Sequence, residues 1–117
     1  ATATGSPAWN FSSGGPLLFP ESEDVAVTPI NPQYATVRPL TLPHLARGGS
    51  IEVEVQPSKD MDIQLIIDGR RLQPLRFGDK VKITRSPATY KLITFGDTQF
   101  FSALRKKGIA IGVRKQL

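Results

Sequence analysis

Proline and glycine interrupt this chain so often that they constrain its fold more than any other feature. Ten residues of each type are spread over 117 positions, so the stretches left for regular structure are short. Proline removes a backbone donor and glycine weakens helices, so this spacing favours short strands joined by turns. We therefore expect an all-β fold, built as one domain over residues 1–117.

Apolar runs and alternation indicate where the first strands lie. In residues 50–56 apolar side chains alternate with Glu52 and Glu54, which is the period-two pattern of a strand with one buried face. The runs Val25–Thr28 and Tyr34–Arg38 each end at a proline, which cannot donate a ladder hydrogen bond. We expect strands at all three places.

Hairpins are predicted for the middle of the chain. Ile63–Ile67 is followed by Asp68-Gly69, a pair that readily adopts the positive φ angles of a two-residue hairpin turn. A second turn at residues 77–79 precedes an alternating strand at 80–84, and Tyr90–Phe95 forms a further apolar run.

One helix is expected, near the carboxyl terminus. Asp97 or Thr98 can cap its start, apolar residues follow at helical spacing, and Gly108 marks its end. Together these elements predict a β-sandwich of short antiparallel strands and hairpins with one short carboxy-terminal helix.

Composition limits the chemistry that the chain can perform. It has no cysteine, which excludes disulfides and thiolate catalysis, and its formal charge of +5 suits an anionic ligand such as a nucleotide, polyphosphate or nucleic acid. Its apolar stretches are far shorter than the roughly 20 residues that a membrane-spanning helix needs.

The single histidine, His44, has no triad spacing, and the acidic cluster at residues 21–24 follows no metal-binding motif. We predict neither a catalytic residue nor a metal site in this chain.

The opening twenty residues combine glycine, serine and threonine with large aromatic side chains. Flexible linkers rarely carry a tryptophan, whereas a loop that approaches a ligand needs glycines for access and an aromatic for contact. Residues 5–12, read as GSPAWNFS and followed by Gly14-Gly15-Pro16, resemble the NAD kinase signature T-G-S-T-A-Y-x-x-S-x-G-G-P. Thr28–Pro32, Arg38–Pro43 and Leu75–Ser86 resemble later family segments in the same order. The resemblance extends from Thr4 to about Gly112 and matches only the carboxy-terminal portion of the family.

This resemblance implies a function that the chain does not complete alone. NAD kinases transfer a phosphoryl group from ATP or polyphosphate to the 2′-hydroxyl of the adenosine ribose of NAD, with Mg²⁺ bridging phosphates. The family's Gly-Gly-Asp-Gly motif and Asn-Glu pair do not occur in this sequence. We therefore expect the NAD-binding and oligomerisation domain of a cytoplasmic homo-oligomer, inactive without an amino-terminal α/β domain, with Mg²⁺ bound by the full-length enzyme.

The resemblance also assigns ligand-facing residues, although Pro7 and Trp9 replace the family's threonine and tyrosine. It places small residues of the opening turn beside the dinucleotide, Trp9 against a base, and Thr28 and Ile30 at the base pocket of a neighbouring subunit. The implied residues are Gly5, Ser6, Ala8, Trp9, Ser12, Gly14, Gly15, Thr28, Ile30 and Asp68.

Other interpretations of the same residues stay open. The opening segment can be a capped turn that packs on the sheet, Trp9 can fill a core, and Asp68 can serve only turn geometry. The whole chain can be a catalytically dead scaffold of the same family. It can also be a small basic β-barrel that binds single-stranded nucleic acid, although core packing explains the aromatics at residues 95–101 better than a stacking platform does.

Overall fold

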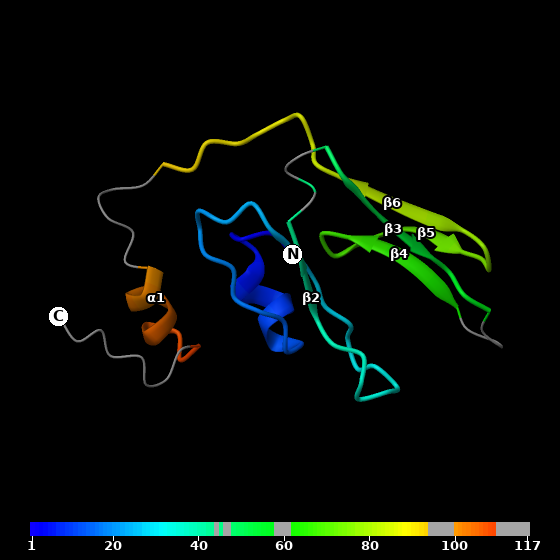
Figure 1. Cartoon of the computed structure of the whole chain (residues 1–117), viewed down its shortest axis with the longest axis horizontal. Coiled ribbons are helices and arrows are strands. Elements are labelled where there is room, and N and C mark those ends of the chain that lie inside the picture. The colour runs from blue at the N-terminus through cyan, green and yellow to red at the C-terminus, as the bar shows by residue number, and fades with distance from the viewer. Residues whose placement is uncertain (44, 46–47, 58–61, 94–99, 110–117) are drawn as a thin grey trace.

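The computed structural model describes residues 1–43, 45, 48–57, 62–93 and 100–109 (Figure 1). One helical turn, η1, opens the chain, and one helix, α1, lies near its end. The elements are η1 Ser6–Asn10, β1 Val25–Val27, β2 Leu40–Leu42, β3 Ser50–Glu54, β4 Ile63–Ile67, β5 Arg70–Leu75, β6 Lys80–Thr84 and α1 Phe100–Lys106. The predicted all-β class, with antiparallel strands and few helices, is confirmed.

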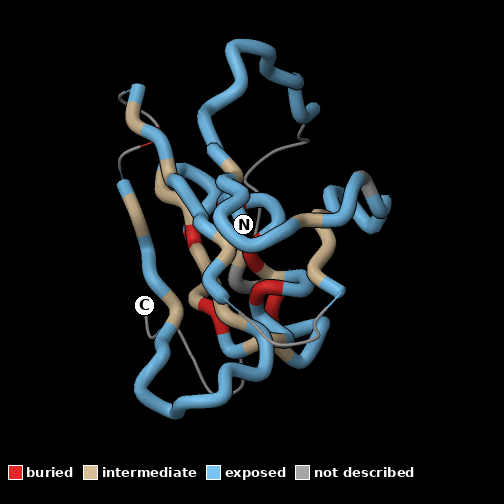
Figure 2. The backbone as a smooth tube through the Cα atoms, turned by 90° about the vertical axis from the view of Figure 1, so that its right-hand side faces the viewer, coloured by how far each residue is buried: buried red, intermediate tan, exposed pale blue. Residues whose placement is uncertain are grey.

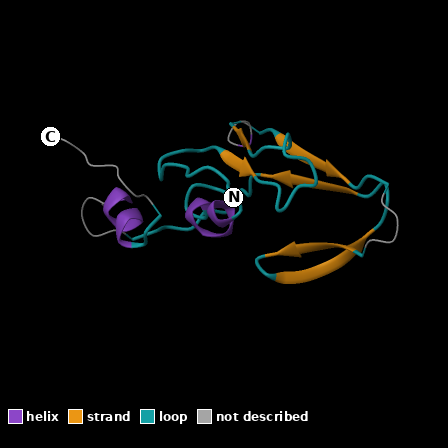
Figure 3. Cartoon of the chain, turned by 90° about the horizontal axis from the view of Figure 1, so that it is seen from below, coloured by secondary structure: helices purple, strands orange, loops and turns teal. Residues whose placement is uncertain are grey.

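The described strands form three antiparallel pairs. β1 pairs with β2, β3 pairs with β6, and β4 pairs with β5. In the β3–β6 pair Ile51 lies opposite Ile83 and Val53 opposite Val81, so the apolar side chains of the alternating pattern share one face. The β4–β5 hairpin forms a layer apart from the β3–β6 pair (Figure 3).

Local turn chemistry explains the hairpins. Asp68 and Gly69 have φ angles of 49° and 74°, which are the two positive values of the predicted hairpin turn. Gly78 has a φ of 83°, in the second predicted turn, and its amide donates to the carbonyl of Val55. These predicted turns and the strands beside them are confirmed.

Two predicted strands are wrong. Tyr34–Arg38 forms turns, with the Val37 amide donating to the Tyr34 carbonyl at 3.0 Å, and the strand that pairs with β1 begins only after Pro39. Residues 90–93 are not in a strand, since their backbone joins no ladder, and the side chain of Ile93 is 80% exposed. Residues 94 and 95 of that predicted strand lie outside the described residues.

Helix α1 confirms the expected carboxy-terminal helix. It ends where Gly108 adopts a φ of 68°, and the amides of Gly108 and Ile109 donate to the last helical carbonyls. Leu104 is buried, and the ring of Phe100 lies 5.9 Å from that of Phe19. The predicted caps, Asp97 and Thr98, lie outside the described residues.

The core is small and lies under the opening segment. Ala3, Leu18 and Ala26 form one buried cluster, accompanied by two buried polar side chains, Ser6 and Asn10. Figure 2 shows that most of the described backbone is exposed or half-buried. Among the described residues, this buried cluster therefore packs against the turn that the resemblance assigns to a ligand.

Candidate functional site

The opening turn projects its tryptophan into solvent. Residues Ser6–Asn10 form one helical turn of the π type, with Pro7 near its start, where a missing amide costs no hydrogen bond. Ala8 departs from helical geometry, with φ −97° and ψ −127°, and kinks the turn. Trp9 follows the kink and is 84% exposed, so this side chain does not fill the core.

A buried serine ties the start of this turn to the core. The Ser6 side chain has no exposed surface, and its Oγ donates to the Ala3 carbonyl at 2.9 Å. The same oxygen accepts from the Leu18 amide at 2.9 Å. Because both contacts run to backbone groups of buried residues, Ser6 holds the turn in place.

Asn10 ties the end of the turn to two further segments. Its Nδ2 donates to the carbonyls of Ser6 and Pro16, at 3.0 and 2.7 Å. Its Oδ1 accepts from Oγ1 of Thr28 at 2.6 Å. Asn10 is absent from the residues assigned by resemblance. Its capacity for both donor and acceptor bonds is visible in the sequence, but its partners are not.

Gly15 leaves the space that Asn10 occupies. Gly15 is buried, and a Cβ at this position would overlap Oδ1 of Asn10 and Oγ1 of Thr28. Its amide donates to the Asn10 carbonyl at 2.8 Å. Glycine is therefore required here because the side chains of Asn10 and Thr28 approach its backbone closely. Gly14 instead has a φ of 80° and is exposed.

The residues assigned by resemblance divide into an outward and an inward set. Exposed residues of the opening turn are Gly5, Ala8, Trp9, Ser12 and Gly14. Ser6 and Gly15 are buried, and the half-buried Thr28 joins them through Asn10. Ile30, two residues after Thr28, is 73% exposed. The structure thus brings Thr28 to the opening turn, whereas Asp68 is exposed in the turn between β4 and β5.

A cleft of about 640 Å³ lies between strand β1 and residues of β3 and β6, and the sequence patterns did not predict it. Thr28 borders both this cleft and Asn10, and strand β1 forms one of its walls. Arg85 and Glu23, which also line it, form an ion pair at 3.5 Å. The lining of this cleft is mixed, because apolar residues of β1, β3 and β6 stand beside as many polar and charged side chains.

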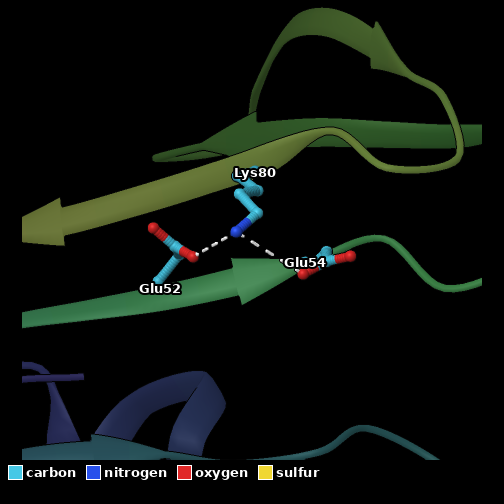
Figure 4. Close-up of polar contacts among 3 residues, drawn as sticks. All are labelled: Glu52, Glu54 and Lys80. Atoms are coloured by element: carbon cyan, nitrogen blue, oxygen red, sulfur yellow. Dashed lines mark hydrogen bonds and ion pairs between the residues drawn. The ribbon is translucent and has the colours of Figure 1, made fainter.

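The β3–β6 pair carries a charged ladder on its exposed surface (Figure 4). Nζ of Lys80 lies 2.8 Å from Oε1 of Glu52 and 3.7 Å from Oε2 of Glu54. The hydrogen bond with Lys80 holds the pKa of Glu52 below its usual value, and the same bond raises the pKa of Lys80. Across the described residues, no three acidic or histidine side chains gather as a metal site would require. This ladder is a solvated ion-pair surface.

Within the described part of the chain, no helix is long and apolar enough to cross a membrane.

Comparison with known proteins identifies the family. Residues 1–95 match the ATP-NAD kinase C-terminal domain. This chain belongs to that family. It is 38% identical over 107 residues to the NAD kinase of Sulfurimonas denitrificans, covering 92% of this chain and 36% of that protein. It is 36% identical to the NAD kinases of Treponema denticola and Aromatoleum aromaticum over the same 92% of the chain, covering 37% and 34% of those proteins.

These matches confirm the resemblance that began at the opening turn. The chain spans little more than a third of the length of the NAD kinases it matches. The chain therefore corresponds to one part of those proteins.

Proposed function

We propose that this chain is the carboxy-terminal, NAD-binding domain of an NAD kinase and that its opening turn faces the dinucleotide. The proposal rests on Trp9, which is 84% exposed. The turn that carries it is held by the side chains of Ser6 and Asn10, which are buried and hydrogen-bonded. A large apolar side chain held in solvent by a rigid turn is suited to stacking on a base.

The surroundings of Trp9 fit a flat ligand with sugar and phosphate groups. Gly5, Ala8, Ser12 and Gly14 are exposed and small, so they leave room for a ribose beside the indole. The positive formal charge of the chain favours an anionic dinucleotide over a neutral ligand. We propose that Asp68, in the turn between β4 and β5, adds a polar contact to the ligand.

In the reaction that we propose, this domain positions the acceptor. The oxygen of the 2′-hydroxyl of NAD attacks the terminal phosphorus of ATP or polyphosphate, the bond to the leaving phosphate oxygen breaks, and the hydroxyl proton passes to a base. We place that base and the residues that orient Mg²⁺ on the remainder of the enzyme, an amino-terminal α/β domain. Positioning and charge stabilisation supply most of the catalysis in such transfers.

We also propose that the β1–β2 connection contacts a second copy of the chain. Ile30, Tyr34 and Val37 are 73%, 65% and 47% exposed on this connection, and Leu40 at its end is 57% exposed. Apolar side chains clustered in this way mark interaction surfaces. Light scattering of the 117-residue chain should show association, and a strictly monomeric solution would contradict this part of the proposal.

The lack of cysteine fits a reducing cytoplasm, where we propose that the enzyme works.

A phosphorylation assay tests the function. The longer protein that carries this chain should convert NAD to NADP with ATP or polyphosphate, and the 117-residue chain alone should not. Robust turnover by the chain alone would contradict the proposal that the catalytic groups lie on the remainder of the enzyme. A longer protein that binds NAD without phosphorylating it would favour the dead scaffold, and salt-dependent oligonucleotide binding without NAD binding would favour the nucleic-acid reading.

A further inference from the structure

Ala1 is hydrogen-bonded to strand β1 as if it belonged to a neighbouring strand. Its amino group donates to the Ala26 carbonyl at 2.6 Å, and the Ala26 amide donates to the Ala1 carbonyl at 2.8 Å. Two residues that exchange both bonds form a hydrogen-bonded pair of antiparallel strands. We propose that the segment directly before Ala1, in the longer protein that carries this chain, adds a strand to β1 and covers the cleft between β1, β3 and β6. The inference rests on the proposed function only in that the chain is one domain of a longer protein.

The pairing of Ala1 fixes the edge and the direction of the added strand. Strand β2 pairs along the other edge of β1. Successive residues of a strand direct their backbone groups to opposite edges, so the Thr28 backbone lies on the same edge as that of Ala26. An antiparallel segment that precedes Ala1 runs toward Thr28, and the second residue before Ala1 would pair with it. This is strand addition to a sheet edge, which main-chain hydrogen bonds stabilise.

Side-chain alternation along β1 decides what the added strand places in the cleft. Ala26 belongs to the buried cluster under the opening segment, so Val27 faces the opposite side of the strand. Val27 lines the cleft together with Ile51 and Ile83 of the β3–β6 pair. The residue directly before Ala1 would lie opposite Val27 and on the same face. We therefore expect an apolar side chain there, which fills the cleft.

The cleft and the Ala1 amino group both suit a continuing polypeptide. Val27 and Ile51 are only half-buried, and Ile83 is 40% exposed, so apolar area is left for an added side chain to cover. Burial lowers the pKa of the Ala1 amino group, because the charged form loses water there. A peptide amide in the same place would donate to the Ala26 carbonyl without a charge to desolvate.

The added strand would also position the rest of the enzyme. The opening turn begins at Ser6, only five residues after Ala1. A strand fixed on β1 would therefore bring the preceding domain, on which we place the catalytic groups, beside the turn that carries Trp9.

Amide hydrogen exchange tests the added strand without relying on NAD binding or kinase activity. The Thr28 amide should exchange at least about tenfold more slowly in the longer protein than in the 117-residue chain. The Gly78 amide, which donates to the Val55 carbonyl, is the control and should exchange equally in both. Equal exchange of the Thr28 amide would overturn the proposal. Protection that grows with the concentration of the 117-residue chain would assign this edge to a second copy and would also overturn it.

Paired cysteines test the register. This chain has no cysteine, and any others in the longer protein are replaced first. A cysteine at the residue directly before Ala1 should form a disulfide with Val27→Cys on mild oxidation, because the two positions form a non-hydrogen-bonded antiparallel pair. The matched control, Thr28→Cys, places its side chain on the opposite face and should stay unlinked. Linkage to Thr28→Cys, or to neither position, would overturn the proposed strand. If both tests succeed but the longer protein does not phosphorylate NAD, only the proposed function fails.

Discussion

Replacing Gly15 with alanine is the sharpest perturbation of the opening turn. The added Cβ would overlap Oδ1 of the buried Asn10 and Oγ1 of the half-buried Thr28. The Asn10 side chain would have to leave its place, and its bonds to the Ser6 and Pro16 carbonyls and to the Thr28 hydroxyl would break. Gly15 has no positive φ angle, so the penalty comes from space and not from backbone strain.

The hydrogen bonds set the size of this penalty. Each contributes about 1 kcal/mol net, and a buried group left without a partner costs about 1–3 kcal/mol. Three lost bonds therefore predict a destabilisation of about 3 kcal/mol, of which the lower entropy of the unfolded alanine variant offsets about 0.5 kcal/mol. This is a large part of the stability of a small domain.

Urea unfolding of the 117-residue chain, followed by circular dichroism, measures the effect. The controls are Gly14→Ala, which has open space around the added methyl group but a φ of 80°, and Gly15→Ala in an Asn10→Ala background. Gly14→Ala should cost only about 1 kcal/mol. Gly15→Ala should cost clearly less when Asn10 is already truncated, because part of the clash is gone. An equal cost in both backgrounds would refute the reasoning.

Three further substitutions probe the remaining parts of the account. Trp9→Ala should weaken NAD binding by the longer protein roughly tenfold in a titration, because base stacking is lost, while unfolding free energy changes by less than about 0.5 kcal/mol at this exposed position. Asp68→Asn removes the charge but keeps a residue that tolerates a positive φ angle. If both the free energy of unfolding and the NAD affinity stay unchanged, Asp68 serves the turn alone. The hydrogen bond with Lys80 holds the pKa of Glu52 below its usual value, so the ion pair stabilises the fold above the unfolded-state pKa and loses its effect as the pH falls through the lower folded-state pKa. Glu52→Gln should abolish this acid-side change in melting temperature, and an unchanged pH profile would contradict the assignment.

Local patterns explain which parts of the fold could be predicted. Alternation at residues 50–54 and the Asp68-Gly69 turn depend on neighbouring residues only, and both were predicted correctly. Tyr34–Arg38 was assigned to a strand because its composition suits one. Pairing partners decide where a strand forms, and β1 pairs with Leu40–Leu42 instead.

The candidate site, too, could be predicted only in part from the sequence. The signature residues of the opening turn could be identified from its glycines and Trp9. The hydrogen bonds of Asn10 could not be predicted, because one partner, Thr28, lies eighteen positions away and is brought to it by strand β1. The same contact explains Gly15, which sequence alone assigns to ligand access.

The central claim is that the opening turn faces a dinucleotide. Titrating NAD into the isotope-labelled longer protein and following the Trp9 indole resonance tests this claim most directly. We predict a saturable shift of that resonance, together with the backbone amides of Ala8, Ser12 and Gly14. NAD binding that saturates while these resonances stay in place would contradict the claim.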